Sequence, residues 1–225
     1  MLLLAIDTST TAISVALHDG TDVLTEVSTL DAKAHAEFLA PNIRSVLAEA
    51  EASASDVTEV VVGTGPGPFT GLRVGIVTAH TFAFALGLPV HGVCSLDALA
   101  HDHWLRSDTR SGELLVATDA RRKEVYAARY VLTPSGVERV AAPVVVRAED
   151  LEPALRELPT AGRGALLYPD ALPHGVEPLD VSAGALADLA VRRQRAGQAL
   201  DGLEPMYLRR PDVAPSAPSQ KSTLG

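Results

Sequence analysis

The clearest pattern of apolar and polar positions lies in the middle of the chain. Residues 60–62 are a β-branched Val run suited to a buried strand, and residues 63–68 then alternate Gly with Thr and Pro. From Phe69 to Gly87, apolar or small side chains lie on almost every helical face, which is typical of a buried helix. The pattern predicts a strand, a glycine-rich turn and a helix. That turn is either a plain tight connection or an anion site at unpaired N–H groups.

The first half of the chain predicts one lobe built around this unit. On its last helix, His101 and His103 point to different faces, so we expect surface histidines and no shared metal ligation. Arg73, His80 and the threonines argue against a membrane span for the central helix. The other elements expected are strands at residues 2–7, 12–17, 23–30 and 89–94, and helices at residues 35–50 and 95–105.

A second series repeats the opening pattern from Glu113. One apolar strand ends at Asp119, as the first strand of the chain ends at Asp7, and a cationic turn and a second strand follow. Two such series predict a duplicated two-lobe α/β fold with a reduced second lobe. The later elements expected are strands at residues 137–147 and 165–168, a short helix at 149–158 and an amphipathic helix at 182–196. The expected division is an N-terminal, partner-binding lobe at residues 1–105, a C-terminal lobe with the C-terminal helix at 106–210, and a disordered tail at 211–225.

The composition and the distribution of charge exclude some classes of function. With 47% hydrophobic and 21% charged residues, the 225-residue chain is typical of a soluble globular protein. The single cysteine, Cys94, excludes an internal disulfide and favours the reducing cytosol, and the first residues lack a signal-peptide pattern. Residues 1–105 contain three Lys or Arg against twelve Asp or Glu, whereas residues 106–225 contain sixteen of each. The first half is therefore a poor nucleic-acid binder by itself.

Four motifs together resemble the TsaB family. They are AIDTST near the start, GTGPGPFTGLRVGI in the middle, DARRKEVY at the second hairpin and EPMYLR near the end, and they span residues 4 to about 210. The resemblance implies an actin/Hsp70-like fold in the cytoplasm. It also implies a role in making threonylcarbamoyladenosine next to the tRNA anticodon, in a heterodimer with TsaD, which transfers the threonylcarbamoyl group. TsaE, the ATPase, and tRNA are expected to be reached through the complex, and a homodimer is expected when the chain is alone.

The chain departs from TsaD where TsaD binds metal. TsaD-type enzymes use a His-x-x-x-His pair, and the corresponding positions here fall near Ser95 and Leu99, neither of which replaces imidazole. The second lobe is also too short for the adenine-binding insert of the larger homologues. We therefore expect no metal, no required cofactor and no catalytic site, with weak nucleotide binding left open.

The central helix offers the candidate partner interface. A small face, formed by Leu72, Gly75, Ala79, Ala83 and Leu86, suits close packing on a sheet. A bulkier stripe on another side suits a partner, unless both faces are internal core. The interface residues expected are Phe69, Arg73, Ile76, His80 and Phe84, joined by His35 and Phe38 from the outer face of the preceding helix.

A rival hypothesis is a free-standing ATPase or phosphotransferase of the actin-like superfamily. A protease is a weaker rival, because it needs metal ligands that the sequence lacks. The ATPase would use Asp7 and Asp119 around a nucleotide, with only Gly162-Arg163-Gly164 as a weak adenosine motif. Its candidate nucleotide-facing residues are Asp7, Thr8, Gly65, Gly67, Asp119 and Arg121.

Overall fold

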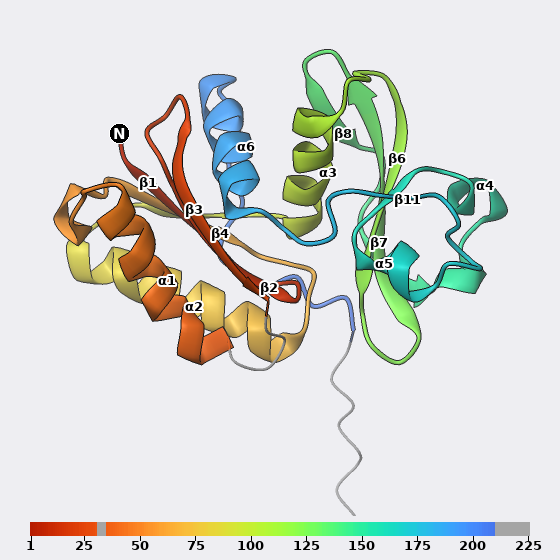
Figure 1. Cartoon of the computed structure of the whole chain (residues 1–225), viewed down its shortest axis with the longest axis horizontal. Coiled ribbons are helices and arrows are strands. Elements are labelled where there is room, and N and C mark those ends of the chain that lie inside the picture. Colours follow the sequence, from red (N-terminus) through yellow and green to blue (C-terminus); the bar gives the residue numbers. More distant parts are fainter. Residues whose placement is uncertain (31–34, 210–225) are drawn as a thin grey trace, which may run out of the picture.

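The computed structural model describes residues 1–30 and 35–209, and it shows two β-sheets side by side with helices around them (Figure 1). The first sheet has the order β3-β2-β1-β4-β5. Its β1–β2 and β2–β3 pairs are antiparallel, and its β1–β4 and β4–β5 pairs are parallel. The strands are β1 (Leu3–Asp7), β2 (Ala12–His18), β3 (Val23–Leu30), β4 (Glu59–Gly63) and β5 (Val90–Val93).

The second sheet repeats this topology. Its path is β8-β7-β6-β10-β11, with antiparallel pairs on one side of β6 and parallel pairs on the other. Thus β6 occupies the place of β1, and β10 that of β4. The predicted duplicated two-lobe α/β fold is confirmed by this match. The strands are β6 (Gly112–Asp119), β7 (Glu124–Thr133), β8 (Gly136–Arg139), β9 (Val144–Arg147), β10 (Thr160–Ala161) and β11 (Gly175–Val176).

Helices cover both faces of the first sheet. Helices α1 (His35–Glu49) and α2 (Phe69–Leu86) lie on one face, and α6 (Ala183–Arg195) lies on the other (Figure 1). Helix α3 (Ser95–Arg106) lies between α6 and the second sheet, where it packs against β6, β7 and β8. The 3₁₀ turns and short helices are η1 (Ala54–Asp56), η2 (Ala148–Asp150), α4 (Pro153–Arg156) and α5 (Arg163–Leu167). We assigned α6 to the second lobe from its place in the sequence, whereas it packs against β1, β2 and β3 of the first sheet. The division into lobes at residue 105 stays a prediction.

The core follows from the two-residue period of the strands. In β1, Leu4 and Ile6 face the cluster that contains α1 and α2, whereas Leu3 and Ala5 face the cluster that contains α3 and α6. Both faces are buried, so the strand is apolar at every position up to Asp7. By length and composition α2 also passes as a membrane-spanning helix, a test that the core helix of a soluble protein passes as well.

Three second-lobe predictions were wrong. Residues 165–168, expected as a strand, belong largely to the short helix α5, where Leu166 and Leu167 are exposed, so their apolar run does not reflect burial. The strand expected at 137–147 is two strands, because Pro143 lies between them and cannot donate to a ladder. The helix expected at 149–158 is shortened to η2 and α4, with Pro153 at the start of α4.

Candidate functional site

The glycine-rich turn brings α2 against the first sheet. The Thr8 hydroxyl, at the end of β1, donates a hydrogen bond to the Gly71 carbonyl over 2.7 Å. A Cβ atom on Gly75 would lie 2.4 Å from Thr8 Oγ1, so only glycine permits this approach. The side of α2 that faces the sheet is therefore lined by small or buried residues. These are Gly71, Leu72, Gly75, Ile76, Ala79 and Ala83.

The opposite side of α2 is apolar and exposed. Phe84 is 82% exposed, Val77 60% and Phe69 49%, and Arg73 and His80 are exposed between them. We call Phe69, Arg73, Val77, His80 and Phe84 the outer face of α2. Their spacing of three and four residues places them along one side of the helix. On α1, Phe38 is 38% exposed.

The predicted interface was wrong at one position. Ile76 is only 8% exposed and packs in the core with α1, so it cannot contact a partner, and Val77 takes its place on the outer face. Leu86, predicted on the small inner face, is exposed. The predicted His35 contact lies outside the described side chains. Val77 was missed because a helix that is apolar all round gives no periodic signal for the direction of its buried side.

Tyr207 connects the C-terminal segment to the start of the outer face. Its ring stacks on Phe69 with centroids 5.2 Å apart, and its hydroxyl accepts a hydrogen bond from Arg73 Nε at 2.9 Å. The Arg73 guanidinium also lies 3.9 Å from the centre of the Phe69 ring. The EPMYLR and GPFTGLR motifs, far apart in the sequence, thus form one aromatic and cationic cluster.

Asp7 is fully buried beneath the turn. Its carboxylate accepts hydrogen bonds from the Ser9 N–H at 2.8 Å, the Ser9 hydroxyl at 2.7 Å and the Ser95 hydroxyl at 2.6 Å. Ser95 in turn accepts the Gly65 N–H at 3.0 Å. Burial raises the pKa of Asp7 despite these donors. Asp7 therefore joins β1, the turn and α3, and it does not line the space between the lobes.

Two hollows lie between the lobes. Asp119, Arg121, Arg163 and Asp180 line the smaller one, whose volume is about 30 Å³. The larger one, of about 490 Å³, lies between Gly67 and Phe69 on one side and Arg121, Arg122 and Tyr126 on the other. Arg163 donates hydrogen bonds to the Asp180 carboxylate from Nε at 2.9 Å and from Nη2 at 2.6 Å. The Asp119 carboxylate accepts a hydrogen bond from the Arg121 backbone N–H at 2.7 Å. Of the six candidate nucleotide-facing residues, Asp119 and Arg121 line the smaller hollow, and Gly67 and Arg121 line the larger one. Thr8 and Gly65 are buried with Asp7.

The two positions that correspond to metal ligands have structural roles here. Ser95 is bonded to Asp7, and Leu99 is a fully buried core residue. Within residues 1–30 and 35–209, no group of three or more His, Cys, Asp or Glu side chains is arranged to hold a metal ion.

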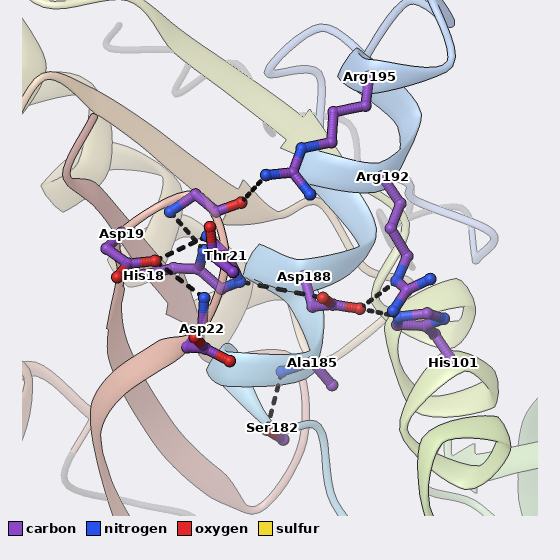
Figure 2. A network of polar contacts seen from close by, with 11 residues as sticks. His18, Asp19, Thr21, Asp22, His101, Ser182, Ala185, Asp188, Arg192 and Arg195 are labelled. Carbon is purple, nitrogen blue, oxygen red and sulfur yellow. Dashed lines mark hydrogen bonds and ion pairs between the residues drawn. The ribbon is translucent and has the colours of Figure 1, made fainter.

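The prediction of a surface His101 was wrong. This side chain is 1% exposed, and its Nε2 lies 2.6 Å from Asp188 Oδ2 on α6 (Figure 2). Its ring also stacks on Trp104. The partner carboxylate lies 87 residues away in the sequence, so no local pattern could have shown this pairing.

Comparisons with known proteins agree on one family. The family model described as TsaD, tRNA N6-adenosine threonylcarbamoyltransferase, matches residues 25–199. The tRNA threonylcarbamoyladenosine biosynthesis protein TsaB of Escherichia coli is 33% identical over 93% of this chain and 95% of its own. An uncharacterized protein of Mycobacterium tuberculosis is 44% identical over 95% of this chain and 94% of its own.

Solved structures agree with this match. YeaZ from Pseudomonas aeruginosa is 30% identical, covers 92% of this chain and 99% of its own, and superposes with a TM-score of 0.79. A second structure from that organism, titled an uncharacterized protein with similarity to peptidase YEAZ, is 32% identical and superposes with a TM-score of 0.78 over 92% of this chain and 99% of its own.

Proposed function

This chain belongs to the TsaB family, and from that premise we propose that it is a non-catalytic partner subunit of a TsaD-type transferase. In this role it supports the formation of threonylcarbamoyladenosine in tRNA, adjacent to the anticodon. TsaE and tRNA join through the complex, the setting is the cytoplasm, and the chain forms a homodimer when TsaD is absent.

The observation that carries the proposal is the outer face of α2. Phe84 and Val77 project into solvent from a helix whose other side is packed against a sheet. Exposed apolar surface of this kind marks a protein interaction site. A TsaD-type protein, being a paralogue, offers a helix pair of the same kind, so the two can pack helix against helix. The same surface accounts for self-association.

The state of the candidate catalytic groups supports a non-catalytic role. Asp7 is fully buried and accepts three hydrogen bonds, so its carboxylate is not available to a nucleotide between the lobes. The carboxylates and guanidinium groups that line the smaller hollow are paired with one another. No comparable observation favours the ATPase or peptidase alternatives.

Reconstitution tests the proposal. The TsaD-type and TsaE-type proteins of the same organism are incubated with tRNA, threonylcarbamoyl-adenylate and ATP, with or without this chain, and the modified nucleoside is measured by mass spectrometry. We expect product only when the chain is present, co-elution of the chain with the TsaD-type protein, and no ATP turnover by the chain alone. Product that forms equally well without the chain would refute the partner role. ATP turnover by the chain alone that is lost in Asp7→Asn would refute the non-catalytic role.

A further inference from the structure

A second pocket lies on the face of the first sheet opposite to α1 and α2. The β2–β3 hairpin, α3 and α6 enclose it, and its volume is about 400 Å³. Four carboxylates but only one guanidinium line it, so its charge is negative at neutral pH. The charged lining residues are Asp22, Glu26, Asp102, Arg106 and Asp188. An acidic pocket alone indicates no ligand, but a buried histidine in its wall adds an independent observation.

That histidine is His18, at the end of β2. It is 1% exposed, and its Nε2 atom has no hydrogen-bond partner among the described residues. Its other ring nitrogen, Nδ1, accepts a hydrogen bond from the Gly20 N–H at 2.9 Å. A nitrogen that accepts from an N–H carries no proton, so the neutral ring carries its proton on Nε2. Burial lowers the pKa of His18, which keeps the ring neutral.

The Nε2–H group points toward Asp188 across a gap. The distance from His18 Nε2 to Asp188 Oδ1 is 3.9 Å, too long for a hydrogen bond (Figure 2). Asp188 Oδ2 already accepts from His101 and from Arg192, each at 2.6 Å, whereas no described residue donates to Oδ1. The pocket wall therefore presents one unused donor and one unused acceptor side by side.

The donor at His18 Nε2 and the acceptor at Asp188 Oδ1 limit which chemical groups can bind between them. An oxygen about 2.8 Å from both atoms spans the gap if it accepts from Nε2–H and donates to Oδ1, as a hydroxyl group does. A metal ion does not fit, because the protonated Nε2 has no lone pair to give. An ammonium group alone does not fit either, because it cannot accept. The surrounding carboxylates, however, favour a cation elsewhere in the same ligand.

We propose that this pocket binds a small organic cation that also carries a hydroxyl group. The hydroxyl bridges His18 Nε2 and Asp188 Oδ1. The ammonium lies beside the carboxylates of Asp22 and Glu26, because Arg106 already holds both oxygens of Asp102 at 2.7 and 3.0 Å. A bound ligand would contact the hairpin, α3 and α6 together. The site is separate from the outer face of α2, so it stands or falls independently of the partner role.

Three small probes test the proposal by calorimetry at constant ionic strength. Ethanolamine has both the ammonium and the hydroxyl, ethylamine lacks the hydroxyl, and ethylene glycol lacks the charge. We expect ethanolamine to bind about tenfold more tightly than either of the others, the effect of one well-placed hydrogen bond or charge contact. Equal affinities for the three probes, or no saturable binding of ethanolamine, would overturn the proposal.

Substitution of His18 locates the site. In His18→Asn the amide oxygen can accept the Gly20 N–H in place of Nδ1, while nothing replaces the Nε2 donor, so the preference for ethanolamine over ethylamine should disappear. The control is His91→Asn on β5, which removes a 40% exposed imidazole outside the pocket and should change nothing. An unchanged preference in folded His18→Asn would contradict the assignment.

Two further measurements apply even if His18→Asn fails to fold. Asp22→Asn removes a carboxylate from an exposed hairpin position and should weaken ethanolamine binding, so unchanged affinity would count against the site. In the unmodified protein, nitrogen-15 spectra should show the His18 Nε2 resonance moving when ethanolamine saturates the protein, with the ring still protonated on Nε2. An unmoved resonance would refute the contact.

Discussion

Two positions on α2, Ile76 and Phe84, distinguish a core residue from a predicted interface residue. Phe84 is 82% exposed and Ile76 is 8% exposed, although both residues are large, apolar and two helical turns apart. The two side chains point about 80° apart around the helix, so changing each of them to glutamate places the same charge once in the core and once in solvent. We expect the Phe84→Glu variant to stay folded but to lose association with itself and with the TsaD-type protein. We expect Ile76→Glu to unfold the first lobe.

The magnitudes follow from burial. In Ile76→Glu the core loses about 2–3 kcal/mol of apolar burial, and a carboxylate without a partner in that site costs several more. The sum is comparable to a total stability of about 5–15 kcal/mol. In Phe84→Glu the free chain changes by less than about 0.5 kcal/mol, because the ring already lies in solvent. In a docked complex the desolvated carboxylate costs about 3 kcal/mol or more, which weakens binding more than about 100-fold.

Gel filtration with light scattering, thermal melting and a pull-down with the TsaD-type protein measure both effects. Val144→Glu is the control, because Val144 is 49% exposed on the second sheet, away from α2. It should keep its melting temperature, its self-association and its partner. The interface assignment fails if Phe84→Glu still associates like Val144→Glu. The burial assignment fails if Ile76→Glu melts at the temperature of the unmodified chain.

Four other outcomes are expected. Ser95→Ala should destabilise the chain by about 2–4 kcal/mol in urea unfolding, because it removes a donor to the buried Asp7 and leaves the Gly65 N–H unpaired; a change below about 0.5 kcal/mol would contradict this. Burial raises the pKa of Asp188, but hydrogen bonds from His101 and Arg192 outweigh it and lower the pKa from 3.8 to about 2. This group therefore stabilises the fold above pH 4, and the effect of about 2 kcal/mol is lost as the pH falls toward 2. In Asp188→Asn that loss should be absent from the unfolding profile. Deleting residues 211–225, which lie outside the described residues and contain few large apolar side chains, should leave the melting temperature and partner binding unchanged, whereas a loss of several degrees would show that they dock. Metal analysis after dialysis should find no stoichiometric zinc or iron, and about one tightly held ion per chain would refute this.

Local patterns in the sequence were sufficient where local physics decides the structure. The β-branched run, the glycine-rich turn and the apolar segment after it became β4, the turn and α2 with nearly the predicted bounds. The repeat of a strand that ends in Asp also predicted the duplication, because each copy had to form the same pair of central strands. The sequence did not show which residues of α2 face the core. Adjacent helical residues lie about 100° apart, so choosing Ile76 in place of Val77 exchanged a core residue for an exposed one.

The sequence also did not show contacts between segments that lie far apart in the chain. The two aspartates that end β1 and β6 are an example. Asp7 and Asp119 end equivalent strands, and the rival ATPase hypothesis gave them equivalent roles around a nucleotide. Ser95 and the start of α3 cover Asp7, so that carboxylate is fully buried. The Asp119 side chain stays 23% exposed and forms an ion pair with Arg121 at 3.1 Å. One repeated motif thus yields a structural carboxylate in one lobe and a solvent-facing one in the other. The difference lies in Ser95, 88 residues after Asp7, and a motif read by itself does not include that partner.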